Sequence, residues 1–281
     1  MAVAPSSLQP PQSPESYGDN AIVFDDVAIA FGRNQVLDGV SFALPRGETK
    51  ILLGVAGSGK STILKLALGL LQPDQGRIEV LGHDVTRMQE RELFELRARV
   101  GIVFQESALF DSLTVRENVA YRLMEDKTLA PDEIEQRVRE ALRFVELEKT
   151  VDKFPSELSG GMRRRVAIAR AIITGPEALL YDSPTGGLDP ITSTTIIELL
   201  LKQRDVYKTS ALMVTHRLQD AYLMATHCYD PKQGKMVEAG TTAQTDVLTT
   251  FLILRDGKVL FDGTPAELVE SDDEYIKEYI Q

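Results

Sequence analysis

One glycine-rich run constrains this chain more than any other segment. Residues 54–61 read Gly-Val-Ala-Gly-Ser-Gly-Lys-Ser, which fits the phosphate-loop spacing G-x-x-x-x-G-K-[ST]. The apolar segment Lys50–Leu53 before it predicts a short buried strand, and Ser61–Leu71 after it predicts an apolar helix. A strand, a glycine turn and a helix N-terminus in this order point backbone N–H groups at an anion. The run therefore predicts a site for the β- and γ-phosphates of a nucleotide.

The loop residues have separate tasks in such a site. Glycines let phosphates approach the backbone closely and supply positive φ angles. Lys60 is expected to reach the phosphate oxygens, and the Ser61 hydroxyl is expected to ligate Mg²⁺. The residues predicted to contact the nucleotide are Gly54, Val55, Ala56, Gly57, Ser58, Gly59, Lys60, Ser61 and Thr62.

Two further motifs follow this loop along the chain. Leu158–Met162 reads Leu-Ser-Gly-Gly-Met ahead of a helix predicted over Gly160–Ile173, with Ser159 as its N-cap. The apolar strand Ala178–Asp182 then ends in a carboxylate, a residue that often only forms a turn. In this order the motifs resemble those of ATP-binding cassette (ABC) ATPases, and the resemblance covers about residues 21–281.

The resemblance implies a fold, cofactors and an assembly. The fold is α/β, an ABC ATPase cassette with a mixed-sheet nucleotide-binding core, an antiparallel β subdomain and a helical signature subdomain. The implied cofactors are ATP and Mg²⁺. The implied assembly is a head-to-tail homodimer, in which each ATP is sandwiched between one phosphate loop and Ser159, Gly160 and Gly161 of the opposite subunit.

Single residues take roles from the same resemblance. Gln105 matches the glutamine that contacts Mg²⁺ and the attacking water, so the implied metal ligands are Ser61, Gln105 and Asp182. His216 matches the switch histidine that grips the γ-phosphate. Phe31 lies where the family stacks an aromatic ring on adenine; the alternative is an ordinary buried strand residue.

Ser183 is the departure from the family that matters most. The family places a glutamate there, directly after the strand-ending aspartate, as general base or polariser of the attacking water. A serine hydroxyl can orient water but cannot take its proton near neutral pH, and losing a general base costs about 10²–10⁴-fold in rate. Either turnover is slow and the chain is an ATP-gated binding module, or Gln105, His216 and the γ-phosphate itself are enough.

Three stretches resemble one subgroup, the Mla/Mce-type phospholipid transport ATPases. They are residues 105–120, 158–167 and 187–192. This resemblance implies a subunit that powers a membrane permease moving phospholipid or a similar hydrophobic substrate, with a periplasmic Mce-type lipid-binding protein as a further partner. It also implies that Phe110 and Leu113 line a groove for the permease coupling helix, whereas the alternative makes them internal core.

Composition narrows the partners and the location. The formal net charge of −11 argues against a nucleic-acid partner, and so against a cassette that acts on DNA or ribosomes. The single cysteine, Cys228, suits a reducing cytosol. No apolar stretch reaches the roughly 18 residues of a spanning helix, and the N-terminus lacks a signal-peptide pattern. We expect a cytoplasmic protein, peripheral on the inner face of the cell membrane.

The expected organisation is a disordered tail over residues 1–20, an ABC ATPase domain over 21–270 and a helical extension over 271–281. Inside the domain, we expect a helical subdomain at about 106–160 and a polar insertion at about 229–248. The insertion is either a surface excursion or a docking element for a partner. Further predicted strands are Ala21–Phe31, Val36–Leu44, Arg77–Leu81, Val100–Phe104, Ala211–Thr215, Thr250–Leu254 and Lys258–Phe261.

A run of three arginines and one single arginine need an interpretation. Arg163–Arg165 lie on the predicted signature helix and are expected to form a solvated or ion-paired face. Arg217 follows the switch histidine where the family usually has aspartate. Leu188-Asp189 fits the D-loop, which couples the two ATP sites of a family dimer.

Overall fold

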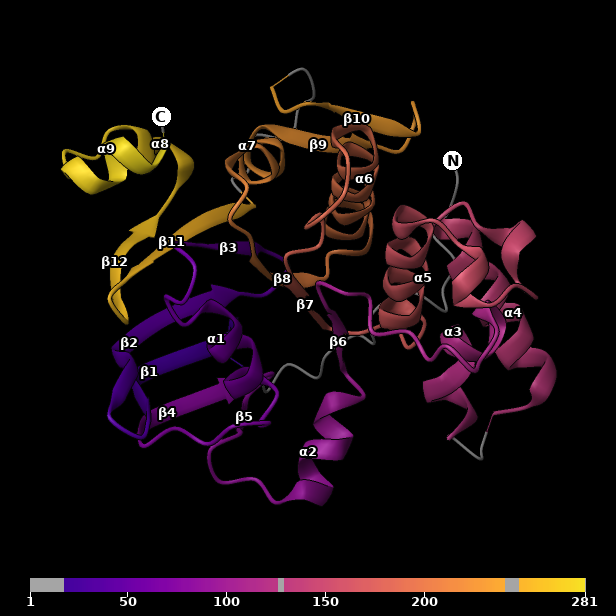
Figure 1. Cartoon of the computed structure of the whole chain (residues 1–281), viewed down its shortest axis with the longest axis horizontal. Helices are drawn as coiled ribbons and strands as arrows, with labels where there is room; N and C mark the ends of the chain where they lie inside the picture. The colour runs from indigo at the N-terminus through magenta and orange to yellow at the C-terminus, as the bar shows by residue number, and fades with distance from the viewer. Residues whose placement is uncertain (1–17, 126–128, 241–247, 281) are drawn as a thin grey trace.

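A six-stranded mixed sheet forms the centre of the protein (Figure 1). The computed structural model describes residues 18–125, 129–240 and 248–280. In the strand order β12-β11-β3-β8-β7-β6, the strands from β11 to β6 run parallel and β12 pairs antiparallel with β11. Their bounds are β3 (Thr49–Leu53), β6 (Val100–Val103), β7 (Ala178–Asp182), β8 (Ser210–Val214), β11 (Thr249–Arg255) and β12 (Lys258–Gly263). The predicted mixed-sheet core is confirmed.

A four-stranded antiparallel sheet lies beside the mixed sheet, as predicted (Figure 1). Its order is β2-β1-β4-β5, with bounds β1 (Asn20–Phe31), β2 (Asn34–Pro45), β4 (Gln75–Val80) and β5 (His83–Asp84). Helix α1 (Lys60–Ala67) contacts strands of both sheets. It ends before the predicted Leu71 because Gly69 takes a left-handed φ of +63° and its N–H bonds the Leu66 carbonyl at 2.9 Å.

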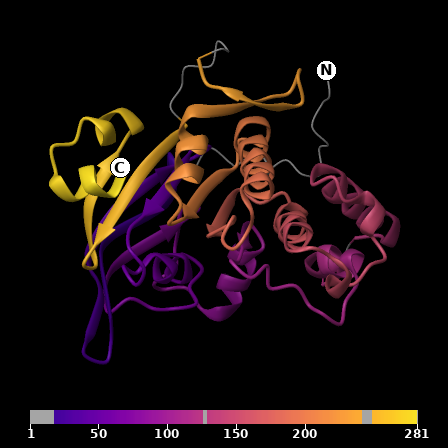
Figure 2. The same ribbon diagram turned by 45° about the horizontal axis from the view of Figure 1, so that its top comes forward.

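The other face of the mixed sheet is covered by helices. The helices after α1 are α2 (Glu90–Arg97), α3 (Val115–Met124), α4 (Pro131–Phe144), α5 (Gly160–Ile172), α6 (Pro190–Tyr207), α7 (Leu218–Thr226), α8 (Pro265–Val269) and α9 (Glu274–Ile280). Helices α5, α6 and α7 pack over this face, and α3 and α4 pack on α5 (Figure 2). Among the described helices, none has the length and hydropathy to cross a bilayer.

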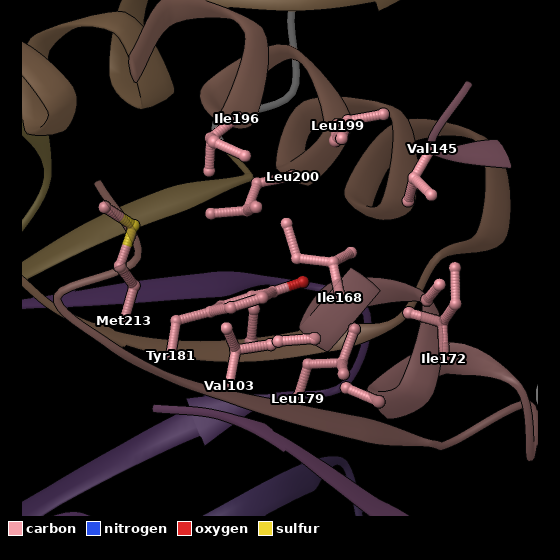
Figure 3. Packing of buried hydrophobic residues seen from close by; sticks show 14 of the residues in the cluster. Val103, Val145, Ile168, Ile172, Leu179, Tyr181, Ile196, Leu199, Leu200 and Met213 are labelled. Atoms are coloured by element: carbon pink, nitrogen blue, oxygen red, sulfur yellow. The ribbon is translucent and has the colours of Figure 1, made fainter. Parts of the chain in front are cut away.

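Alternation along the strands divides the buried side chains between two cores. Ile51 and Leu53 of β3 face the core shared with α3 to α7, whereas Leu52 faces the core shared with α1 and the antiparallel sheet. In the first core, Tyr181 lies flat between strand and helix residues (Figure 3) and is 2% exposed. Burial raises the pKa of its hydroxyl. This packing holds α5 and α6 on the strands that end at the candidate site.

The region of the expected polar insertion contains a hairpin. Strands β9 (His227–Asp230) and β10 (Lys235–Glu238) pair with each other. They are tied to α6, because the Met236 N–H donates to Glu198 at 3.1 Å and the Tyr229 N–H donates to Asp205 at 2.7 Å. Residues 241–247 of the expected insertion, and 1–17 of the expected tail, lie outside the described residues. The two alternatives, a surface excursion and a docking element for a partner, both stay predictions.

Gly101 provides a test of how tightly β6 packs on α5. A Cβ atom at Gly101 would collide with the Ala171 carbonyl oxygen and lie 2.7 Å from Leu179 Cδ2. We expect Gly101→Ala to lower the free energy of unfolding by about 1–3 kcal/mol, measured by urea denaturation. Gly18→Ala is the control, since nothing lies within 4 Å of its added Cβ. Equal stabilities for the two variants would contradict this packing.

Candidate functional site

The predicted site residues gather at one edge of the mixed sheet. The phosphate loop follows β3, His216 follows β8, Asp182 ends β7 and Gln105 follows β6. In the sheet these strands are neighbours in the order β3-β8-β7-β6 and all run parallel. Their carboxyl ends therefore meet, which is where open α/β sheets bind ligands.

The phosphate loop depends on glycine at specific points. Gly57 and Gly59 have φ angles of +81° and +94°, and Gly59 is the N-cap of α1. A Cβ at Gly59 would lie 2.6 Å from Leu37 Cδ2 and 3.0 Å from the Val36 carbonyl. The loop therefore packs closely against β2. Its backbone N–H groups are followed directly by the free N–H groups of the first turn of α1.

Lys60 lies within this loop rather than pointing away from it. Its Nζ donates to the carbonyls of Gly54 at 2.8 Å and Val55 at 2.7 Å, and to Ser58 Oγ at 3.2 Å. Burial lowers the pKa of Lys60, and the nearby charge of Asp182 opposes that shift. The ammonium group is thus held by loop oxygens that phosphate oxygens can replace.

The oxygen donors at this edge suit a magnesium ion. Ser61 is exposed in the first turn of α1, and Asp182 is half-buried at the end of β7. Among the described residues, no group of three or more His, Cys, Asp or Glu side chains could by itself hold a metal. A few hard oxygen donors beside a phosphate site fit Mg²⁺, which keeps waters and substrate oxygens in its shell. The ligand roles of Ser61, Gln105 and Asp182 stay predictions.

Ser183 adopts a left-handed backbone and is nearly buried. Its φ is +47° and its exposed fraction is 7%. The Ser183 N–H donates to the Val214 carbonyl at 2.8 Å, which ties this turn to β8. A Cβ built on Gly186 would lie 3.4 Å from both Gln105 Cγ and Ser183 Cβ. Gln105 and Ser183 are therefore neighbours beside Asp182.

Arg164 corrects the expectation of a solvated arginine face. It is 4% exposed, and its guanidinium donates to the Gln105 carbonyl, to the Ser183 carbonyl at 2.9 Å and to Ser107 Oγ at 3.3 Å. Burial lowers its pKa, against the charges of Glu106 and Asp182. For Arg164 the expected solvated or ion-paired face is wrong, because this residue lies on the buried side of α5 and its donors are satisfied by loop oxygens.

The sequence pattern does not separate Arg164 from its neighbouring arginines. Arg164 is in helical phase with Ile168 and Ala171, which are buried on the same helix. Arg163 is the exposed member of the trio, and it donates to the Leu158 carbonyl at 2.6 Å. Arg165 is equally in phase with the buried Ile168, Ala169 and Ile172, so helical phase alone does not single out Arg164.

Arg217 has a structural role that its unusual position did not predict. Its guanidinium donates to the Thr185 carbonyl at 3.1 Å, to the Leu188 carbonyl at 3.4 Å and to Ser193 Oγ at 2.7 Å. These partners surround the predicted D-loop at Leu188-Asp189, and Asp189 caps α6 by accepting from the Thr192 N–H at 3.0 Å. Arg217 therefore ties the segment after His216 to the D-loop.

Two predicted ligand residues are exposed to solvent. His216 is exposed after β8, next to the phosphate-loop strand. Phe31 is 49% exposed at the end of β1, so the alternative of a buried strand residue is wrong. An exposed ring and an exposed imidazole are available to a ligand, but their contacts with adenine and the γ-phosphate stay predictions.

The signature residues face away from the centre of the protein. Ser159 caps α5, as predicted, by accepting from the Met162 N–H at 3.3 Å. A Cβ atom built on Gly160 would contact Leu188 of the D-loop. A Cβ atom built on Gly161 would contact Thr192 at the start of α6. Ser159 and Gly160 are exposed. The structure thus brings the signature beside the D-loop and leaves its outer surface open.

The comparisons with known proteins agree with this geometry. A protein-family model described as "ABC transporter" matches residues 37–186. The chain is 38% identical to "Protein TRIGALACTOSYLDIACYLGLYCEROL 3, chloroplastic" of Arabidopsis thaliana, over 94% of this chain and 74% of that protein. It is 32% identical to "Intermembrane phospholipid transport system ATP-binding protein MlaF" of Haemophilus influenzae, over 93% and 99%. It is also 37% identical to "Methionine import ATP-binding protein MetN" of Bifidobacterium longum, over 79% and 57%.

A solved structure supports the same fold. It is a dimeric ATP-binding cassette in a post-hydrolysis state, bound to ADP and Pi. The TM-score is 0.72 at 28% sequence identity, over 86% of this chain and 98% of that chain. The similar protein therefore holds a nucleotide and pairs with a second copy.

Lys60 tests the phosphate loop. Lys60→Ala removes the positive charge that reaches phosphate oxygens, and we expect the Kd for Mg-ATP to rise by at least about 10-fold, because hydrogen bonds to charged groups are the strong ones. Isothermal calorimetry measures the affinity, and circular dichroism checks that the fold is unchanged. Lys65→Ala is the control, because Lys65 is an exposed lysine of the same helix. An unaltered affinity in Lys60→Ala would rule out the assignment.

Proposed function

Because the chain belongs to the ABC transporter family of ATP-binding cassettes, we propose that it is the ATP-hydrolysing subunit of a transporter of phospholipid or a similar hydrophobic substrate. The single observation that carries the ATPase part is the meeting of Gly54–Ser61, Asp182, Gln105 and His216 at one sheet edge. The lipid part is supported by the phospholipid-transport relative that the chain matches almost from end to end.

Nucleotide binding is the first step of this function. The N–H groups of the loop and of the first turn of α1 would receive the β- and γ-phosphates. Lys60 Nζ would exchange the Gly54 and Val55 carbonyls for phosphate oxygens. Ser61, Asp182 and Gln105 would hold Mg²⁺, which neutralises the charge that develops on the phosphates. Phe31, exposed at the end of β1, would stack on the adenine ring.

A second copy of the chain would complete the site. Ser159 and Gly160 are exposed at the N-terminus of α5, and their neighbours belong to the D-loop and α6. In a head-to-tail dimer these groups of one subunit would meet the γ-phosphate held by the other. Closure on ATP and reopening after hydrolysis would then drive a separate permease. The proposed location is the cytoplasmic face of the inner membrane, with a periplasmic Mce-type protein as a further partner.

Hydrolysis has two possible forms at this site. Water attacks the γ-phosphorus, the bond to the β–γ bridging oxygen breaks, and the water's proton must leave. In the first form, Gln105 and His216 orient the water and the γ-phosphate takes its proton, so turnover continues. The second form is an ATP-gated cassette with little hydrolysis, which Ser183 favours because no carboxylate follows Asp182.

A groove on the opposite side of β6 from the phosphate loop fits a permease segment. Its volume is about 320 Å³, and it is lined by residues of α2, β6, α3 and α5. Phe110 and Tyr121 are 43% and 42% exposed, with ring centroids 4.6 Å apart. Arg97, Arg122 and Arg170 also line it. The two aromatic rings would bind the apolar face of an amphipathic coupling helix. The arginines would pair with acidic residues of the same helix. The expected helical subdomain, residues 106–160, contributes Ala108, Phe110, Tyr121 and Arg122 to this surface.

Ser183→Glu tests the hydrolysis step. If the missing carboxylate limits the chemistry, the wild type binds ATP, stays closed and turns over slowly, and Ser183→Glu raises kcat by about 100-fold or more. Phosphate release under saturating Mg-ATP measures the rate. Ser183→Gln is the control, since it adds the same bulk at this left-handed position without a base.

The opposite result would reject the gated form. If the wild type already turns over at about 1 s⁻¹ or faster and Ser183→Glu leaves this rate unchanged, another group orients the water. His216→Ala should then abolish turnover while ATP still binds.

Phe110→Asp tests the permease and its cargo. Tagged wild type isolated from its native membranes should bring down an integral-membrane permease and phospholipid, identified by mass spectrometry. Phe110→Asp should lose the permease while keeping ATP binding, because a charge in the apolar groove opposes docking. Val269→Asp is the control, at an exposed apolar residue of α8 outside the groove.

Retention of the permease by Phe110→Asp would show that this ring does not line the docking surface. A permease that comes down with no lipid, and whose ATPase activity responds to a polar solute such as methionine, would reject the lipid assignment.

A further inference from the structure

The first residue of the phosphate loop has both of its backbone groups held by side chains. The Gly54 N–H donates to Tyr279 Oη at 3.1 Å, and the Gly54 carbonyl accepts from Lys60 Nζ at 2.8 Å. Tyr279 lies 225 residues away in the sequence, on α9 near the end of the chain. A hydrogen bond between such distant segments, at the point where β3 becomes the phosphate loop, links α9 directly to the nucleotide site.

The backbone at Gly54 has little room to move on its other side. Its φ is +146°, and a Cβ there would lie 2.6 Å from the Leu254 carbonyl oxygen and 2.8 Å from Ser58 Oγ. The residue is thus enclosed by the end of β11 and by its own loop. The Tyr279 hydroxyl closes the remaining side, where the N–H would otherwise lack the partner that a half-buried donor needs.

Helix α9 holds this hydroxyl in place. Ile276 is 2% exposed and anchors the helix in the core shared with α7 and α8. The Arg255 guanidinium carbon lies 4.3 Å from the centroid of the Tyr275 ring, which stacks on the Tyr279 ring with centroids 6.0 Å apart. Figure 1 shows α9 beside β11 and β12, and Leu254 of β11 also encloses Gly54. Burial raises the pKa of Tyr279, so the hydroxyl stays neutral.

We propose that Tyr279 is a positioning residue that holds the phosphate loop in its nucleotide-binding geometry through the Gly54 N–H. The proposal rests on the ATP-binding function proposed above. When ATP arrives, Lys60 must release the Gly54 carbonyl to contact phosphates, and the Tyr279 bond is the side-chain contact that remains on Gly54. The hydroxyl keeps the loop from relaxing during this exchange, so its role is in ATP affinity rather than in the chemical step.

The test compares two tyrosines of the same helix. Tyr279→Phe removes the hydroxyl that bonds Gly54. Tyr275→Phe removes a buried hydroxyl that has no hydrogen-bond partner among the described residues. The probe is Mg-ATP. Calorimetry gives its Kd, steady-state kinetics give KM and kcat, and amide hydrogen exchange follows the peptide that contains Gly54.

Tyr279→Phe is expected to raise the Kd and KM for Mg-ATP by about 2- to 10-fold, the effect of losing one hydrogen bond, with kcat nearly unchanged. Exchange at Gly54 should become faster in this variant alone. The Tyr275→Phe variant should match the wild type in all of these measurements.

Two results would overturn the inference. The first is an unchanged Kd and an unchanged Gly54 exchange rate in Tyr279→Phe. The second is an equal loss of affinity in both variants, which would assign the effect to packing of α9. A wild type that does not bind Mg-ATP would instead reject the proposed function, so the two failures are distinguishable.

Discussion

The rest of the site depends on the hydrogen bonds that the buried Arg164 guanidinium makes. A charge taken out of water is costly unless its donors are satisfied. Arg164 satisfies them with the carbonyls of Gln105 and Ser183 and the hydroxyl of Ser107. The same helix, α5, begins with Ser159 at the outer surface. One helix therefore connects the exposed signature to the two loops beside Asp182.

On the other side of β7, the Arg217 guanidinium also donates hydrogen bonds to backbone carbonyls and a hydroxyl. It binds the Thr185 and Leu188 carbonyls and Ser193 Oγ, and so ties the segment after His216 to the D-loop. Asp220 nearby is buried, which raises its pKa, and it accepts from Thr185 and lies 3.8 Å from Arg217. An aspartate at position 217 could not make the Arg217 contacts, because carbonyl oxygens need donors. Arg217 therefore binds the D-loop, which lies next to the signature.

The phosphate loop is held by its own oxygens and by distant segments. Lys60 donates to the carbonyls of Gly54 and Val55 in the loop, and Tyr279 of α9 accepts from the Gly54 N–H. The signature faces outward, beside the D-loop. These features fit the proposed half-site, in which one surface binds phosphate and another carries the signature. The dimeric cassette to which the chain is similar in fold shows that this architecture can pair.

The sequence by itself determined the local elements: the strand, glycine turn and helix of the phosphate loop, the Ser159 cap on α5, and the carboxylate at the end of β7. These depend on alternation, glycine φ angles and capping, which act over a few residues. Only the tertiary structure decided the burial of Arg164, the exposure of Phe31 and the contact of Tyr279 with Gly54. Each depends on which distant element packs against the residue, and the local pattern around a residue does not contain that information.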